Sequence, residues 1–166
     1  MNTKQKIMIL DDDVQIRQSL VKLLELEGYD VVAAGDGKEA LEHFGSKRIA
    51  LLVLDLNLPM KSGWDILEEV SALDPLLPII IITGRDRQYD LSAAVGVGAL
   101  MEKPLDIPLL LKMIRELLAE TPEKRLKRLA GVEQSTRYFP APAFGRSNQL
   151  PGRTRGRRQT SAREVK

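Results

Sequence analysis

The sequence predicts an α/β fold in which five strands alternate with five helices, a (βα)5 arrangement around an open parallel sheet. From the amino terminus to about residue 120, short apolar runs alternate with segments whose apolar residues recur at helical spacing. The runs are apolar throughout, which is typical of strands whose two faces are both covered by helices. Each strand is therefore expected to lie in the interior and to be followed by a helix on one sheet face.

The five strands are expected where the apolar runs occur. These runs are residues 7–10, 31–34, 51–54, 79–82 and 99–101. The four isoleucines from Ile79 to Ile82 give the strongest signal, because β-branched residues favour strands.

The helices are expected in the segments between and after these runs. Helical spacing of apolar residues occurs in residues 16–24, 38–44, 66–73 and 110–118, and more weakly in residues 91–95. Gly28 is expected to close the first helix and Pro75 to end the third. Pro108 fits the first turn of the last helix.

The composition of the 166 residues, 43% of them apolar, predicts a folded and soluble protein. Cysteine is absent, which excludes disulfides and cysteine-bound metals. The first apolar run is too short for a signal peptide, and no run approaches the roughly 20 residues of a membrane span. We therefore expect a cytoplasmic protein without a membrane partner.

Charge divides the chain into an acidic domain, residues 5–120, and a basic tail, residues 121–166. Residues 1–120 hold 13 Lys and Arg against 20 Asp and Glu, a net charge of −7, and the remainder holds 12 against 3, a net charge of +9. Residues 123–129 are compatible with an extension of the last helix. The rest of the tail, rich in Pro, Gly and Arg and without apolar periodicity, is expected to be largely disordered.

Polar residues follow four of the five predicted strands. The first strand is followed by Asp11, Asp12 and Asp13, the third by Asp55, the fourth by Thr83 and Gly84, and the fifth by Lys103 and Pro104. If the strand order is 2-1-3-4-5, these side chains meet at one sheet edge, where open parallel sheets bind ligands.

The chemistry of this set points to a metal ion and a phosphoryl group. Clustered carboxylates without histidine or cysteine favour Mg²⁺. Asp11, Asp12 and Asp55 carry three negative charges, which Mg²⁺ and Lys103 together balance. A carboxylate can attack phosphorus to form an aspartyl phosphate, and such a transfer depends mainly on positioning and charge neutralisation.

The motifs at these strand ends resemble the receiver domain of two-component response regulators. They are residues 9–13, residues 54–63 with Asp55, Pro59 and Gly63, residues 82–84, and residues 102–104. The resemblance covers roughly residues 5–120 and implies a flavodoxin-like (CheY-like) sheet. Each motif alone is weak, since Asp55 by itself would more often be a turn residue, whereas the four together are specific.

The resemblance implies a role for each site residue. It makes Asp55 the phosphoacceptor, Asp12 a direct Mg²⁺ ligand and Asp11 a ligand through water. Asn57 would offer its backbone carbonyl to the metal, and Thr83 and Lys103 would bind phosphoryl oxygens, with Gly84 leaving room beside them.

Two further features concern how phosphorylation would change the shape of the domain. The bond between Lys103 and Pro104 is expected to be cis, which proline permits. At position 100 this sequence has Leu100, whereas the family usually has Tyr or Phe there. The phosphate chemistry should survive this difference, but a leucine transmits a smaller change in packing than a ring.

The leading hypothesis is a single-domain receiver that takes a phosphoryl group from a histidine kinase or histidine phosphotransfer protein and signals to a downstream protein target. It would promote its own phosphorylation and dephosphorylation without turning over outside substrates. In a second reading the basic tail binds nucleic acid, but residues 121–166 lack a recognition motif. A third reading, a phosphohydrolase with an aspartyl-phosphate intermediate, needs a second Asp where this chain has Asn57.

Overall fold

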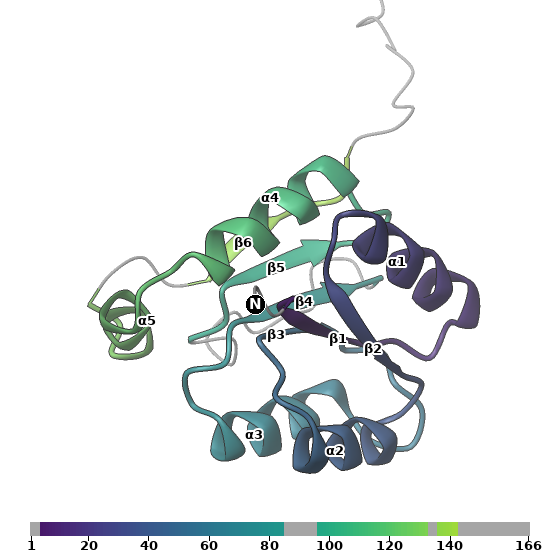
Figure 1. Cartoon of the computed structure of the whole chain (residues 1–166), viewed down its shortest axis with the longest axis horizontal. Helices are drawn as coiled ribbons and strands as arrows, with labels where there is room; N and C mark the ends of the chain where they lie inside the picture. The colour runs from purple at the N-terminus through teal and green to yellow at the C-terminus, as the bar shows by residue number, and fades with distance from the viewer. Residues whose placement is uncertain (1–3, 85–95, 133–135, 143–166) are drawn as a thin grey trace, which may run out of the picture.

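The strands of the chain form a parallel sheet, and helices lie in one layer on each of its faces (Figure 1). The computed structural model describes residues 4–84, 96–132 and 136–142. The strands are β1 (Lys6–Leu10), β2 (Asp30–Ala34), β3 (Leu51–Asp55), β4 (Ile79–Thr83), β5 (Ala99–Glu102) and β6 (Arg137–Phe139). The helices in the described residues are α1 (Val14–Leu26), α2 (Gly37–Ser46), α3 (Gly63–Leu73), α4 (Ile107–Leu118) and α5 (Pro122–Leu129).

The sheet has the order β2-β1-β3-β4-β5-β6, and every neighbouring pair is parallel. The predicted order 2-1-3-4-5 is therefore confirmed, with a sixth strand added beside β5. Because all strands run the same way, the carboxyl ends of β1, β3, β4 and β5 lie along the same side of the sheet, here called the carboxyl edge. The polar residues that follow those strands therefore lie along the carboxyl edge.

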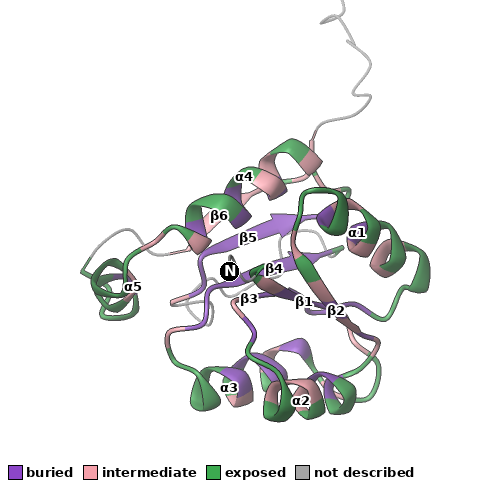
Figure 2. Ribbon diagram, in the orientation of Figure 1, coloured by how far each residue is buried: buried purple, intermediate pink, exposed green. Residues whose placement is uncertain are grey.

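The core consists of two apolar layers, one on each face of the sheet. Figure 1 shows α2 and α3 on one face and α1 and α4 on the other. All residues of β3 and β4 are buried, as Figure 2 shows for the strands at the centre of the sheet. The uniformly apolar runs in the sequence thus correspond to strands covered on both sides.

Side-chain caps fix where several helices begin. The Asp13 carboxylate accepts hydrogen bonds from the backbone N–H groups of Gln15 and Ile16, at 2.8 and 3.0 Å, and so starts α1 directly after β1. Ser62 caps α3 in the same way. As predicted, Gly28 follows the end of α1, with a φ of 92° that favours glycine.

Part of the region after residue 120 is ordered, which corrects the prediction of disorder for residues 136–142. Residues 122–129 form a separate helix, α5, because Thr121 caps it and Pro122 occupies its first turn. Residues 137–139 form β6 on the edge of the sheet. Local composition missed β6 because its partners, β5 and α4, lie far away in the sequence.

Some sequence predictions fall on parts of the chain outside the described residues. The weak helix expected at residues 91–95 is one of them. The arginine cluster at residues 153–158 is the other, together with the rest of residues 143–166. The disorder expected for those tail residues stays a prediction.

Candidate functional site

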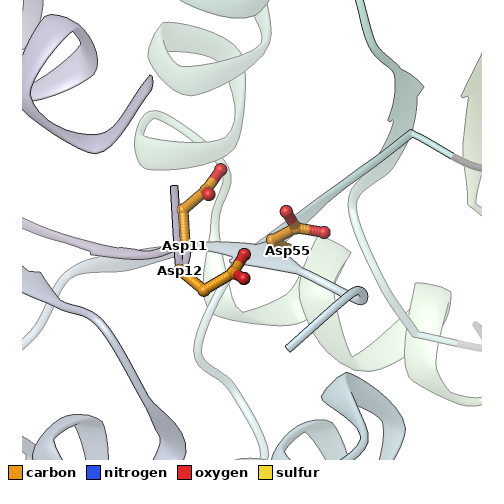
Figure 3. A group of neighbouring side chains, drawn as sticks. All are labelled: Asp11, Asp12 and Asp55. Carbon is orange, nitrogen blue, oxygen red and sulfur yellow. The ribbon is translucent and has the colours of Figure 1, made fainter. Parts of the chain in front are cut away.

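Three carboxylates gather where β1 and β3 end. Figure 3 shows Asp11 and Asp12, which follow β1, beside Asp55, the last residue of β3. One oxygen from each lies within 4.8 Å of the others. Asp11 and Asp55 are buried, whereas Asp12 is exposed. The cluster is thus built from two buried carboxylates and one that faces solvent.

Lys103 reaches this cluster from the end of β5. Its Nζ lies 2.6 Å from Asp55 Oδ2 and 2.9 Å from Asp11 Oδ2. The lysine side chain is 18% exposed, so both ion pairs are largely removed from water. The ammonium group offsets one of the three negative charges and holds the two buried carboxylates in place.

Backbone N–H groups fix the remaining oxygens of the buried carboxylates. The Asn57 N–H donates to Asp55 Oδ1 at 2.8 Å, and the Asp13 N–H donates to Asp11 Oδ1 at 2.9 Å. The N–H of Lys103 donates to the Thr83 carbonyl at 2.7 Å, which ties β5 to β4 beside the pocket. The two buried carboxylates, Asp55 and Asp11, are therefore each oriented by the loop that follows their strand.

The electrostatics of the pocket follow from burial and from these hydrogen bonds. Burial raises the pKa of the Asp11 carboxyl, more than the hydrogen bonds from Lys103 and the Asp13 N–H lower it. Burial alone would lower the pKa of Lys103. The hydrogen bonds to Asp11 and Asp55 outweigh it, so that the pKa of the ammonium lies above its ordinary value.

The donor set fits a hard divalent cation such as Mg²⁺. Three carboxylates and one ammonium leave the pocket with an excess of negative charge that a divalent ion would neutralise. Both oxygens of Asp11 already accept hydrogen bonds, and Asp12 presents its carboxylate to solvent. Asp12 is therefore the carboxylate best placed to reach an ion directly, and the backbone of Asn57 is bonded to Asp55 through its N–H.

The other predicted site residues lie at or beside this edge. Thr83 is fully buried at the end of β4, opposite Glu102 in the strand pairing. A Cβ added at Gly84 would lie 3.8 Å from Asn57 Nδ2, so the turn after β4 passes close to the β3–α3 loop. The peptide bond between Lys103 and Pro104 is cis, as the resemblance implies.

Leu100 lies in the core. It is fully buried in the apolar layer on the side of α2 and α3, and it pairs in register with Tyr138 of β6. A tyrosine from the region after residue 130 thus lies on the strand beside it.

Arg17 is a site-supporting residue that sequence reasoning missed. Its Nη1 donates to the Asp11 carbonyl at 2.6 Å, which fixes the backbone that carries the carboxylate cluster. Its guanidinium also lies 3.4 Å from the position of a Cβ at Gly35. The sequence does not indicate this contact. Arg17 is one of many polar residues on the helix, and whether it reaches the Asp11 carbonyl depends on the angle between β1 and α1.

No helix in the described parts of the chain combines the length and the apolar character needed to cross a membrane.

Curated proteins similar to this chain are response regulators. Response regulator MprA of Mycobacterium ulcerans is 36% identical over 118 residues, covering 70% of this chain and 51% of that protein. MprA of Mycobacterium avium is also 36% identical over 118 residues, covering 70% of this chain and 52% of its own length. The chain thus spans about half the length of the curated relatives it matches.

Solved structures with the same fold are receiver domains. A CheY-like receiver domain protein from Methanospirillum hungatei shares 32% identity and a TM-score of 0.69, covering 74% of this chain and 98% of that one. Response regulator TrrA from Thermotoga maritima, solved in complex with Mg²⁺ and BeF, shares 26% identity and a TM-score of 0.64, covering 68% and 98%. The sequence itself matches the response regulator receiver domain family over residues 7–115. This chain belongs to the response regulator receiver domain family, whose members act in two-component systems.

Proposed function

We propose that Asp55 accepts a phosphoryl group and that the chain signals by the change in shape that follows. The observation that carries this proposal is the position of the Asp55 carboxylate. It is buried at the end of β3, held at Oδ1 by the Asn57 N–H and at Oδ2 by Lys103, with Asp11 and Asp12 beside it. A carboxylate fixed in this way is oriented for attack, and the lysine needed to stabilise a phosphoryl group already touches it.

The proposed transfer is a nucleophilic displacement at phosphorus. An Asp55 oxygen attacks the phosphorus of an acyl or histidinyl phosphate, the P–O or P–N bond to the donor breaks, and the donor leaves with that electron pair. The Lys103 ammonium pairs with an oxygen of the incoming phosphoryl group, and the Thr83 hydroxyl donates a hydrogen bond to another. Asp12, Asp55 and the Asn57 carbonyl would hold a Mg²⁺ ion, with Asp11 acting through water, and the ion would supply charge neutralisation.

The proposed donor is a histidine kinase or a histidine phosphotransfer protein, and the receiver acts on an unidentified downstream protein in the cytoplasm. The chain promotes its own phosphorylation and dephosphorylation and is not a turnover enzyme for outside substrates. Nucleic-acid binding by the basic tail stays the alternative prediction. The arginine cluster on which that alternative depends lies outside the described residues.

Intact-mass measurement tests the proposal directly. With Mg²⁺ and acetyl phosphate, the wild type should gain about 80 Da, the mass of one PO₃ unit. Asp55→Asn should gain nothing, and EDTA should prevent labelling of the wild type. Asp74→Asn, which removes an exposed carboxylate at the end of α3, is the matched control and should label normally. Labelling of Asp55→Asn equal to that of the control would contradict the assignment.

A further inference from the structure

The outer edge of β5 is covered by a segment of the chain itself. Residues 136–142, here named the edge segment, contain β6, which pairs with β5 through Arg137, Tyr138 and Phe139. An exposed strand edge is a template for pairing with other chains, and a bound segment closes it. The edge segment thus occupies a surface that would otherwise be available to another extended peptide.

Glu102 at the end of β5 is the main polar anchor of this segment. The Tyr138 hydroxyl donates to Glu102 Oε1, and the Ala141 N–H donates to Glu102 Oε2 at 3.1 Å. Glu102 is 9% exposed, so a carboxylate largely removed from water has both oxygens engaged by the edge segment. Departure of the segment would remove these two partners, which makes the contact specific rather than a loose covering.

Arg137 and Phe139 make further contacts that hold the segment. The Arg137 guanidinium forms an ion pair with Glu116 of α4 and donates to the Gly98 carbonyl at 3.4 Å. Phe139 packs against the apolar layer on the side of α1 and α4. The segment is therefore attached to both β5 and α4.

The Glu102 anchor is the residue next to Lys103 in the chain. Lys103 Nζ holds Asp55 and Asp11, while its backbone N–H bonds the carbonyl of Thr83, the residue opposite Glu102 in the strand pairing. A phosphoryl group on Asp55 would add negative charge and three acceptor oxygens, so Lys103 would exchange its present partners for them. Because Glu102 and Lys103 share a peptide bond, a shift of Lys103 would also move Glu102, whose carboxylate holds the edge segment.

We propose that the edge segment is a latch on the β5 edge, closed while Lys103 bonds the Asp55 carboxylate and loosened when Asp55 carries a phosphoryl group. The proposal rests on the phosphorylation of Asp55 proposed above. Coupling of this kind is reciprocal, so loosening the latch should in turn favour phosphorylation. Phosphorylation would thereby open a strand edge that the unmodified protein keeps covered.

Hydrogen exchange of the full-length chain tests the coupling. With Mg²⁺ present, beryllofluoride should accelerate amide exchange in residues 136–142 about tenfold, a typical coupling between two sites. Strand β2, at the opposite edge of the sheet, should not change and serves as the internal control. Unchanged or slower exchange in the edge segment would overturn the latch.

Two variants test the anchor. Tyr138→Phe removes the hydroxyl that donates to Glu102, and Tyr29→Phe, a tyrosine whose ring packs on the core near β2, is the matched control. Without beryllofluoride, Tyr138→Phe should already exchange several-fold faster in residues 136–142, and with Mg²⁺ present it should bind beryllofluoride more tightly than the control. Glu102→Gln, which keeps the side-chain shape but leaves one acceptor oxygen, should behave like Tyr138→Phe. Variants that match Tyr29→Phe in both measurements would contradict the proposal.

Intact mass of the same protein preparation, incubated with Mg²⁺ and acetyl phosphate, separates the two proposals. Labelling of Asp55 with unchanged exchange in the edge segment overturns the latch alone. Absence of labelling in the wild type overturns phosphoacceptance, and the latch with it.

Discussion

Gly63 and Leu56 lie so close together that a Cβ on Gly63 would come within 2.5 Å of the Leu56 Cα and 2.8 Å of the Asp55 carbonyl oxygen. The Gly63 N–H also donates to the Leu56 carbonyl at 3.2 Å. The first residue of α3 is thereby pressed against the backbone that carries Asp55, the proposed phosphoacceptor. The glycine in the β3–α3 motif is required by this close approach.

Gly63→Ala should therefore disturb both stability and labelling. A methyl group there must push the backbone of β3, which we expect to cost about 2 kcal/mol of unfolding free energy and to slow acetyl phosphate labelling. Urea unfolding and intact mass measure the two effects. Gly45→Ala is the matched control: Gly45 lies in α2 with nothing within 4 Å of an added Cβ, so its replacement should be neutral or stabilising. Equal behaviour of the two variants would show that the close approach at Gly63 is relieved without cost.

Mg²⁺ binding should depend more on Asp12 than on Asp11. Asp11 already accepts hydrogen bonds at both oxygens, whereas Asp12 is exposed and can turn toward an ion. We expect Asp12→Ala to weaken Mg²⁺ binding at least tenfold and Asp11→Ala by less, measured by titration calorimetry. Asp74→Ala, at the far end of α3, should bind as the wild type does. A larger loss in Asp11→Ala than in Asp12→Ala would reverse the assignment of the direct ligand.

Without metal, the Asp11 charge should reduce stability at neutral pH. Burial raises the pKa of Asp11 in the folded state above the ordinary value of 3.8, so the folded state binds the proton more tightly than the unfolded state. The resulting stabilisation is complete below the unfolded pKa and is lost as the pH rises through the higher folded pKa.

Asp11→Asn, which cannot ionise there, should therefore be more stable than the wild type at pH 7 in EDTA. The difference should shrink as the pH falls through the raised pKa of Asp11. Urea unfolding across this pH range measures it, and excess Mg²⁺ should remove the advantage by stabilising the wild type. A variant less stable than the wild type at pH 7 would mean that the ion pair with Lys103 outweighs the cost of burial.

Arg128 should be essential to the docking of α5. It is 7% exposed, and its guanidinium donates to Glu120 Oε2 at 2.7 Å and to the Gly96 carbonyl at 2.6 Å. Arg128→Ala would leave a largely buried carboxylate unpaired, and we expect a loss of about 3 kcal/mol in unfolding free energy. Lys124→Ala, an exposed cation on the same helix, should change stability by less than about 0.5 kcal/mol. Similar stabilities of the two variants would mean that α5 contributes little to the fold.

The elements that the sequence predicted are those decided by local pattern. The isoleucines of β4 can only be buried, and Asp11, Asp55 and Lys103 each follow such a run, so their meeting at one edge follows from parallel strands. Arg128 was not identified as structural, because a cation within a basic segment resembles a solvated charge. Strand β6 has three residues, and two of its anchors, Glu102 and Glu116, lie more than 20 residues earlier. No local signal encodes such contacts.

Because β6 runs parallel to the other strands, the chain crosses the molecule once more before it reaches residue 140. The chain enters β1 at Lys6 on one side of the sheet, and it leaves β6 at Phe139 on the side where Asp55 lies. A reporter or tether attached before β1 therefore starts at the opposite end of the strands from Asp55, whereas cargo joined after residue 142 starts at the same end as Asp55, two strands beyond β4. We therefore expect cargo joined after residue 142 to obstruct a phosphodonor that approaches Asp55 more than cargo joined before β1 does.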